Sequence, residues 1–224
     1  MKKITFLFAI GIALAACHSK VEYIIKGTLS DKTMDGKEIY LNKYDEFGLQ
    51  SSDTVLIDGN KFQFKGVQTE PAVYYLLMDD AAASGEIALG APLLVKPGKI
   101  TVEVENDRVK RGGNEENKAY QQFMDDQYPV IQKMLNLQNE ELLNSNLDDR
   151  EKQIALYSDY TNTLEQLKII TLNYLLKNIG NRLGEETFIN SFQMFEYDEI
   201  QKILTQASDS FRQSPAVIEI LGEI

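Results

Sequence analysis

The sequence predicts an α+β fold: an N-terminal antiparallel β-sandwich or partly open barrel of about seven strands, followed by a C-terminal helical segment. Up to Glu105, short runs of alternating apolar and polar residues are separated by turn residues, as in strands with one buried face. After Arg111-Gly112-Gly113, apolar residues recur at steps of three and four, which is typical of helices. The predicted β domain is therefore 21–111 and the helical segment 112–224, together long enough to bury a sizeable core.

The first residues have the composition of an export signal. Lys2-Lys3 precede an apolar stretch, Ile4 to Leu14, which is shorter than the ~20 residues that span a bilayer. The sequence Leu14-Ala15-Ala16-Cys17 follows, and it resembles the lipobox at which bacterial lipoproteins are cleaved and lipidated. We expect residues 1–16 to be a lipoprotein signal peptide and residues 17–20 to be a lipidated tether.

Cys17 is the only cysteine and His18 the only histidine of the chain. With no partner for an internal disulfide, Cys17 is expected to carry the lipid; a free thiol or an intermolecular disulfide is the alternative. Two or three acyl chains give stable anchoring, whereas one binds only marginally. His18 lacks nearby ligands for a metal and is read as part of the tether. The expected location is the bacterial cell envelope, membrane-anchored, on the outer membrane or facing the periplasm.

Seven strands are expected between Val21 and Glu105, separated by turn signals. Residues Ser51 to Gly66 predict a β-hairpin, because Asp58-Gly59 favours a tight turn with positive φ angles. This hairpin supplies the third and fourth strands. The others are expected at Val21–Leu29, Lys37–Lys43, Ala72–Met78, Pro92–Val95 and Lys99–Glu105.

The helical segment is expected to start with Asn114 as a cap. Pro129 lies inside the first apolar stripe and should kink or split that helix. A second long helix is expected from about Asp148 until just before Gly180. Shorter helices should follow at Glu185–Phe195, Asp198–Ala207 and Pro215 to the C-terminus. The last carries five large aliphatic residues, and we expect it to dock on the preceding helices while leaving part of its apolar surface exposed.

The formal charge is −11, and loss of Lys2 and Lys3 with the signal peptide would make it −13. Such a chain is not expected to bind nucleic acid, which needs clustered basic residues. From this total charge, electrostatic attraction to anionic lipid is not expected either, so the lipid at Cys17 would hold the chain at the membrane.

The sequence indicates no catalytic, metal or cofactor site. Thiol exchange usually needs two thiols, and a Ser-His-Asp arrangement needs a histidine base. Asp31 and Asp35-Gly36 resemble the start of a calcium loop, but the later ligands are missing, so a plain turn is favoured. Asp79-Asp80 would point to opposite faces of a strand and read as a solvated turn. Tyr44 and Phe47 could form a recognition loop before the hairpin; packing under the loop is the alternative.

As an ordered set, several segments resemble the domain of unknown function at the N-terminus of Bacteroidetes thiol-disulfide oxidoreductase lipoproteins of the peroxiredoxin/TlpA type. They are I-K-G-T-L-S-D (Ile25–Asp31), E-I-Y-L-N-K-Y-D (Glu38–Asp45), D-G-N-K-F-Q-F-K-G (Asp58–Gly66), E-P-A-V-Y-Y-L (Glu70–Leu76) and V-K-P-G-K-I-T-V (Val95–Val102). In that family a helical segment follows and often ends in a run such as S-P-A-V-I-E-I-L (Ser214–Leu221) before a thioredoxin-like domain. Here the sequence stops at that point, so the family's Cys-x-x-Cys is expected to be absent and no catalytic residue is carried over.

Three functions are compatible with these expectations. The first is a lipid-anchored, non-catalytic binding or assembly module with a protein partner. The second is an accessory, non-catalytic subunit of a thiol-disulfide oxidoreductase system, with a thioredoxin-like protein as its partner. The third is an enzyme whose site the sequence does not reveal. No cofactor is expected.

Overall fold

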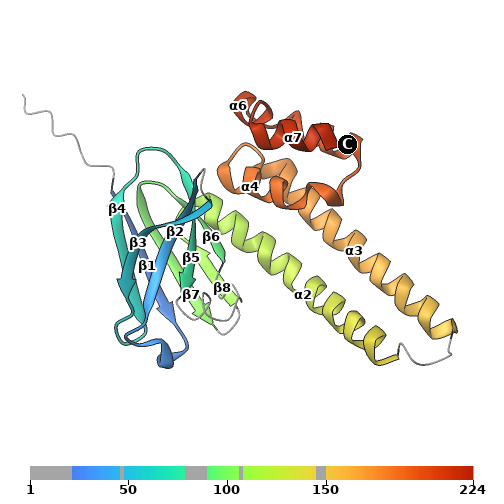
Figure 1. Ribbon diagram of the computed structural model, residues 1–224, viewed down its shortest axis with the longest axis horizontal. Helices are drawn as coiled ribbons and strands as arrows, with labels where there is room; N and C mark the ends of the chain where they lie inside the picture. Colours follow the sequence, from blue (N-terminus) through green and yellow to red (C-terminus); the bar gives the residue numbers. More distant parts are fainter. Residues whose placement is uncertain (1–21, 46–47, 79–89, 106–107, 145–149, 224) are drawn as a thin grey trace, which may run out of the picture.

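The computed structural model describes residues 22–45, 48–78, 90–105, 108–144 and 150–223. In these residues eight strands come first and helices follow (Figure 1), which confirms the predicted α+β class. The strands are β1 (Glu22–Leu29), β2 (Glu38–Asp45), β3 (Gly48–Leu56), β4 (Lys61–Val67), β5 (Ala72–Met78), β6 (Ala91–Val95), β7 (Gly98–Glu105) and β8 (Arg108–Gly112). The helices are α2 (Glu115–Asn144), α3 (Arg150–Asn178), α4 (Arg182–Ser191), α5 (Tyr197–Leu204), α6 (Asp209–Arg212) and α7 (Pro215–Glu223), with short 3-10 turns η1 (Lys32–Met34) and η2 (Phe192–Met194).

The strands form a sandwich of two four-stranded sheets. Sheet A has the order β4-β1-β7-β8 and sheet B the order β3-β2-β5-β6. Alternate residues of each strand enter one shared core, because successive side chains of a strand point to opposite faces. The fully buried members of this core include Ile25, Phe64 and Ile100 from sheet A and Ile39, Leu41, Leu76 and Leu93 from sheet B.

The hairpin predicted over Ser51–Gly66 is wrong, although a tight turn forms within it. Asp58 and Lys61 exchange two backbone hydrogen bonds of 2.9 and 3.0 Å. The residues between them are Gly59 and Asn60, with φ angles of 66° and 121°. The centre of the turn is thus one residue later than the predicted Asp58-Gly59. Glycine and asparagine tolerate these positive φ angles better than other residues do.

Beyond this turn the two strands separate into different sheets. The Ile57 N–H donates to the Lys37 carbonyl in sheet B, whereas the Leu29 N–H donates to the Asn60 carbonyl in sheet A, both at 2.9 Å. β3 then pairs with β2 and β4 pairs with β1. The turn therefore carries the chain from one layer of the sandwich to the other.

Sheet A also departs from the predicted antiparallel pattern. β1 lies parallel to β7, with Ile25 opposite Ile100, and antiparallel to β4. The eighth strand, β8, exceeds the predicted seven. It contains Arg108, Lys110 and Arg111, so it offers little apolar alternation from which a strand could be recognised.

Helix α2 starts where the sequence predicts. The Asn114 side chain accepts a hydrogen bond of 2.8 Å from the Asn117 N–H, as an N-cap does. Pro129 does not split the helix, which continues to Asn144. Its ring lies on the exposed side, so it removes a backbone hydrogen bond without disturbing packing. α2 and α3 form an antiparallel helical hairpin that projects from the sandwich (Figure 1).

The short helices α4 to α7 pack with the adjoining parts of α2 and α3 around a second core. Its buried members include Phe123, Tyr174, Leu175, Phe188, Ile200, Ile203, Phe211, Val217 and Ile220. Within α7, Val217 and Ile220 are buried, whereas Ile218 and Leu221 remain exposed. The last helix therefore docks as expected and keeps part of its apolar surface exposed.

The buried side chain of Asn117 joins α2 to the sandwich at the edge strand β6. It accepts a hydrogen bond from the Leu94 N–H (2.8 Å) and donates one to the Leu94 carbonyl (3.0 Å), as a neighbouring strand would. Lys96 adds an ion pair of 2.7 Å with Glu116. At the β6 edge of sheet B, the backbone N–H and C=O groups of Leu94 thus find their hydrogen-bond partners on a helix.

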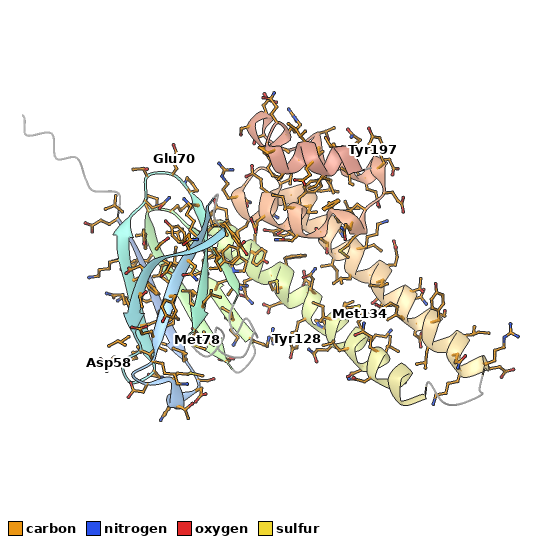
Figure 2. The ribbon with its side chains drawn as sticks, viewed as in Figure 1. Asp58, Glu70, Met78, Tyr128, Met134 and Tyr197 are labelled. Atoms are coloured by element: carbon orange, nitrogen blue, oxygen red, sulfur yellow. The ribbon has the colours of Figure 1, made fainter. Side chains whose placement is uncertain are left out.

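A second attachment joins α2 to β8. The Arg111 N–H donates a 2.9 Å hydrogen bond to the Gln121 side chain. Arg108 forms an ion pair of 2.7 Å with Asp125, and its guanidinium lies 4.3 Å from the centre of the Tyr128 ring (labelled in Figure 2). Both edges next to α2 are therefore held by polar contacts, which fix the helical segment relative to the sandwich.

Candidate functional site

A cleft of about 710 Å³ lies between the outer face of sheet B and the short C-terminal helices. One wall comes from β2, β5 and the connection between β4 and β5, and the other from α4, α6 and the start of α7. The fold places these walls together because α2 is attached to β6 and β8 and the chain then returns along α3. Pockets of this volume at the junction of two structural units are common ligand sites.

Tyr75 and Glu186 connect the two walls. Tyr75 lies on the outward face of β5, and its hydroxyl donates a hydrogen bond to Glu186 of α4. Burial raises the pKa of Tyr75 well above its ordinary value, and the hydrogen bond to Glu186 and the charge of that carboxylate raise it further. The Tyr75 hydroxyl is therefore held in its protonated form as a hydrogen-bond donor to Glu186.

A smaller hollow of about 310 Å³ lies against the same pair. It is also lined by Met124 and Gln127 of α2 and by Thr171 of α3. The Gln127 amide donates a 3.0 Å hydrogen bond to the Thr171 hydroxyl. Because Tyr75 and Glu186 line both hollows, their hydrogen bond lies where the larger cleft and the smaller hollow meet.

Tyr44 lies at the rim of the larger cleft. Its side chain is 58% exposed, and its ring meets the Tyr75 ring edge-on with 5.3 Å between centroids. Tyr44 belongs to β2 and not to the predicted loop. Its exposure argues against packing under a loop, while its contact with Tyr75 holds the ring in place. A fixed, exposed tyrosine offers an apolar face and a hydroxyl to a ligand.

The cleft combines apolar walls with charged groups. Its apolar surface comes from side chains that include Pro71, Val73, Ile189, Phe211 and Pro215. Lys43 and Arg182 contribute positive charge, and three glutamates, Glu70, Glu185 and Glu186, contribute negative charge. The buried Glu185 forms an ion pair of 2.8 Å with Arg182. The Ser208 hydroxyl donates to it at 3.4 Å. The arrangement can therefore bind by apolar contact and hydrogen bonding.

The other residues singled out in the sequence do not join this site. Asp31 accepts hydrogen bonds from the N–H and the hydroxyl of Thr33, and Asp35 accepts one from the Gly59 N–H at 2.6 Å, so both carboxylates stabilise turns. Phe47, Cys17, His18 and the pair Asp79-Asp80 lie outside the described residues.

Sequence reasoning missed Tyr75 and Glu186 as a pair. They are 111 positions apart, so no spacing could connect them. One signal was present: Ala72–Met78 is apolar on both faces, which shows that the outer face of that strand is covered as well. It does not show which element covers it.

Within the described ranges, no group of three or more His, Cys, Asp or Glu side chains is placed to hold a metal ion. In the same residues, no helix combines the length and the apolar character needed to cross a bilayer.

Comparison with protein families shows that residues 23–120 fit the model of a domain of unknown function, DUF4369. The match covers the sandwich from the second residue of β1, the cap residue Asn114 and the first turns of α2 with Asn117. It includes Tyr44 and Tyr75 of the cleft but not Glu186. A search of the curated proteins finds no match.

Proposed function

We propose that this protein is a cell-envelope lipoprotein, anchored through Cys17, whose folded part is a non-catalytic binding module. Its location would be the outer membrane or another surface facing the periplasm. The signal-like segment and the small residues before Cys17 support the anchor. The cleft between sheet B and α4 supports the binding role. No cofactor is part of this proposal.

The observation that carries the binding role is the exposed Tyr44 on a cleft whose walls come from both halves of the chain. Tyrosine, held rigidly over an apolar pocket, is a common anchor of protein interfaces. Within the cleft, Arg182 and Glu185 form an ion pair, and Glu186 accepts the hydrogen bond of the Tyr75 hydroxyl. These features suit a segment of a protein partner that inserts an apolar side chain between Pro71 and Phe211.

A photo-crosslinking amino acid placed at position 44 should give a discrete cross-linked product in intact cells. The matched control is position 197, because Tyr197 is equally exposed (59%, against 58% for Tyr44) but does not line the cleft. Once the partner is purified, Tyr44→Ala should weaken its binding about tenfold or more, the usual loss at an interface hot spot. Equal products from both positions would contradict the cleft as the binding site.

A second candidate function is that of an accessory subunit in a thiol-disulfide oxidoreductase system. It is supported by the match to DUF4369 and by the resemblance to the N-terminal domains of TlpA-type lipoproteins from Bacteroidetes. The partner cross-linked from position 44 decides between the two: a thioredoxin-like protein with Cys-x-x-Cys favours the accessory role. A partner without such a motif favours a general binding or assembly module.

The anchor has its own test. Cys17→Ser should move the protein from the membrane fraction to the soluble or precursor pool after a high-salt wash, because no acyl chains would remain to bury ~0.8 kcal/mol per methylene. His18→Ser is the matched control and should stay with the membrane. Fractionation and intact mass give the readout. Equal retention of the Cys17→Ser protein, with no lipid mass on the wild type, would refute lipid anchoring.

A further inference from the structure

The outer face of sheet A carries charge opposite to that of the chain as a whole. Four lysines point outward from three adjacent strands and are exposed: Lys26 of β1, Lys61 and Lys65 of β4, and Lys99 of β7. Within the described residues, none of the four ammonium groups has an ion-pair partner within 4 Å. Three glutamates, Glu22, Glu103 and Glu105, share this face. Glu105 forms an ion pair of 2.8 Å with Lys110 of β8, so the lysines remain in excess.

The negative charge of the chain is concentrated elsewhere. Residues 115–224 contain nine basic and nineteen acidic residues, a net charge of −10 out of the total of −11. The main helix contacts with the sandwich involve β5, β6 and β8, and Figure 1 shows the helices on that side, away from β4 and β1. At physiological salt a charge is screened within ~8 Å, so the lysine face acts separately from the acidic helices.

Two of the lysines flank an apolar side chain at the end of the face where β1 begins. Across three strands, Ile24 lies between Lys65 and Lys99. Val67 is 56% exposed and lies opposite Glu22 on the neighbouring strand. Lysine stems with apolar neighbours suit a membrane–water interface, where the ammonium groups reach the headgroups and the aliphatic parts lie beneath them.

The short stretch of chain between Cys17 and this end of the face indicates that the surface facing the lysines is a bilayer. Five residue steps separate Cys17 from Glu22, the first residue of β1, and such a segment spans at most about 18 Å. A lipid on Cys17 would therefore keep Ile24, Lys65 and Lys99 close to the headgroups of the bilayer that holds it.

We propose that the outer face of sheet A lies against an anionic bilayer surface, with Lys26, Lys61, Lys65 and Lys99 contacting the headgroup phosphates. This inference rests on the proposed anchoring at Cys17. It revises the expectation drawn from total charge, because the fold separates the lysines from the acidic helices. The contact would orient the protein so that the cleft between sheet B and α4 faces away from the membrane.

The test uses residues 17–224 with Cys17→Ser, a chain that keeps every described residue but cannot be lipidated. The probe is phosphatidylcholine vesicles with or without phosphatidylglycerol, at about 0.15 M salt, where a Debye length of about 8 Å screens the acidic helices from the vesicle surface. We expect cosedimentation with the anionic vesicles only, and loss of that binding as salt is added. A lysine at an anionic surface contributes about fivefold in partitioning. Changing all four lysines to glutamine should therefore weaken binding roughly 25-fold or more, even if only two of them reach the surface.

The matched control changes four exposed lysines of the helical segment to glutamine, with the same change in net charge: Lys118, Lys133, Lys177 and Lys202. It should bind like the parent chain. Far-UV dichroism checks that both variants are folded. Equal binding to neutral and anionic vesicles would overturn the proposal, and so would equal losses of binding in the two variants. It would also be overturned if the variant of the four sheet A lysines bound the vesicles like the parent chain and lost only self-association. Because this chain carries no lipid, these outcomes are independent of the Cys17 fractionation result.

Discussion

Replacing Gly184 with alanine should lower the free energy of unfolding by about 3 kcal/mol or more, the upper part of the range for overpacked sites. Gly184 is buried in the first turn of α4. A Cβ atom there would lie 1.9 Å from the Asn178 carbonyl oxygen and 2.8 Å from the Ile179 nitrogen. Both are backbone atoms at the end of α3, so α4 as a whole would have to move.

The matched control is Gly222→Ala in α7, where an added Cβ would meet no atom within 4 Å. Alanine favours a helix over glycine, so this change should be neutral or slightly stabilising. Thermal denaturation followed by far-UV dichroism gives the comparison. A loss of about 3 kcal/mol corresponds to roughly 6–12 °C for a chain of this size. If both variants melt like the wild type, the close approach of α4 to α3 is not present in solution.

Deleting residues 215–224 should also lower the melting temperature, by several degrees or more. Val217 and Ile220 are buried in the same cluster as Phe188 and Phe211, and full burial of each aliphatic side chain stabilises by about 1.5–3 kcal/mol. The deletion removes both of them and uncovers the aromatic side chains beneath. A tail that served only as a free partner-binding segment would instead leave the melting temperature unchanged.

Two isoleucines of α7 give a test without truncation. Ile220 is 5% exposed and Ile218 is 60% exposed, so they differ in burial but not in residue type or helix. Ile220→Ala should cost about 2–5 kcal/mol, whereas Ile218→Ala should change stability by less than about 0.5 kcal/mol. Similar denaturation midpoints for the two variants would contradict the docking of α7 seen in the structure.

Local sequence signals predicted the elements well and their partners poorly. A run that is apolar on both faces located β5, alternation located β7 almost to the residue, and Asn114 marked the start of α2 correctly. The tight turn at residues 58–61 was also predicted within one residue. The hairpin failed because a turn sets where the chain reverses, whereas pairing is decided by strands far away in the sequence. The parallel pairing of β1 with β7 was missed for the same reason, because the two strands lie far apart in the sequence and no local pattern connects them.

The candidate site was less accessible to sequence reasoning than the fold. Tyr44 was singled out because an aromatic residue stood in an apparently irregular segment, and it does lie at the cleft. Tyr75 and Glu186 come together only because α4 returns to the outer face of sheet B, after both long helices have been traversed. The lysine face was hidden for a related reason: its members come from β1, β4 and β7, and only the order of the sheet places them side by side.

The parallel pairing of β1 with β7 has a consequence for how the sandwich assembles. β1 lies at the start of the described chain, yet one of its neighbours begins only at Gly98. Until β7 has joined sheet A, one side of β1 keeps its backbone N–H and C=O groups unpaired, and such an open edge can pair with other chains. A folding chain therefore leaves β1 open to pairing with other molecules until a segment about 70 residues further along has docked beside it.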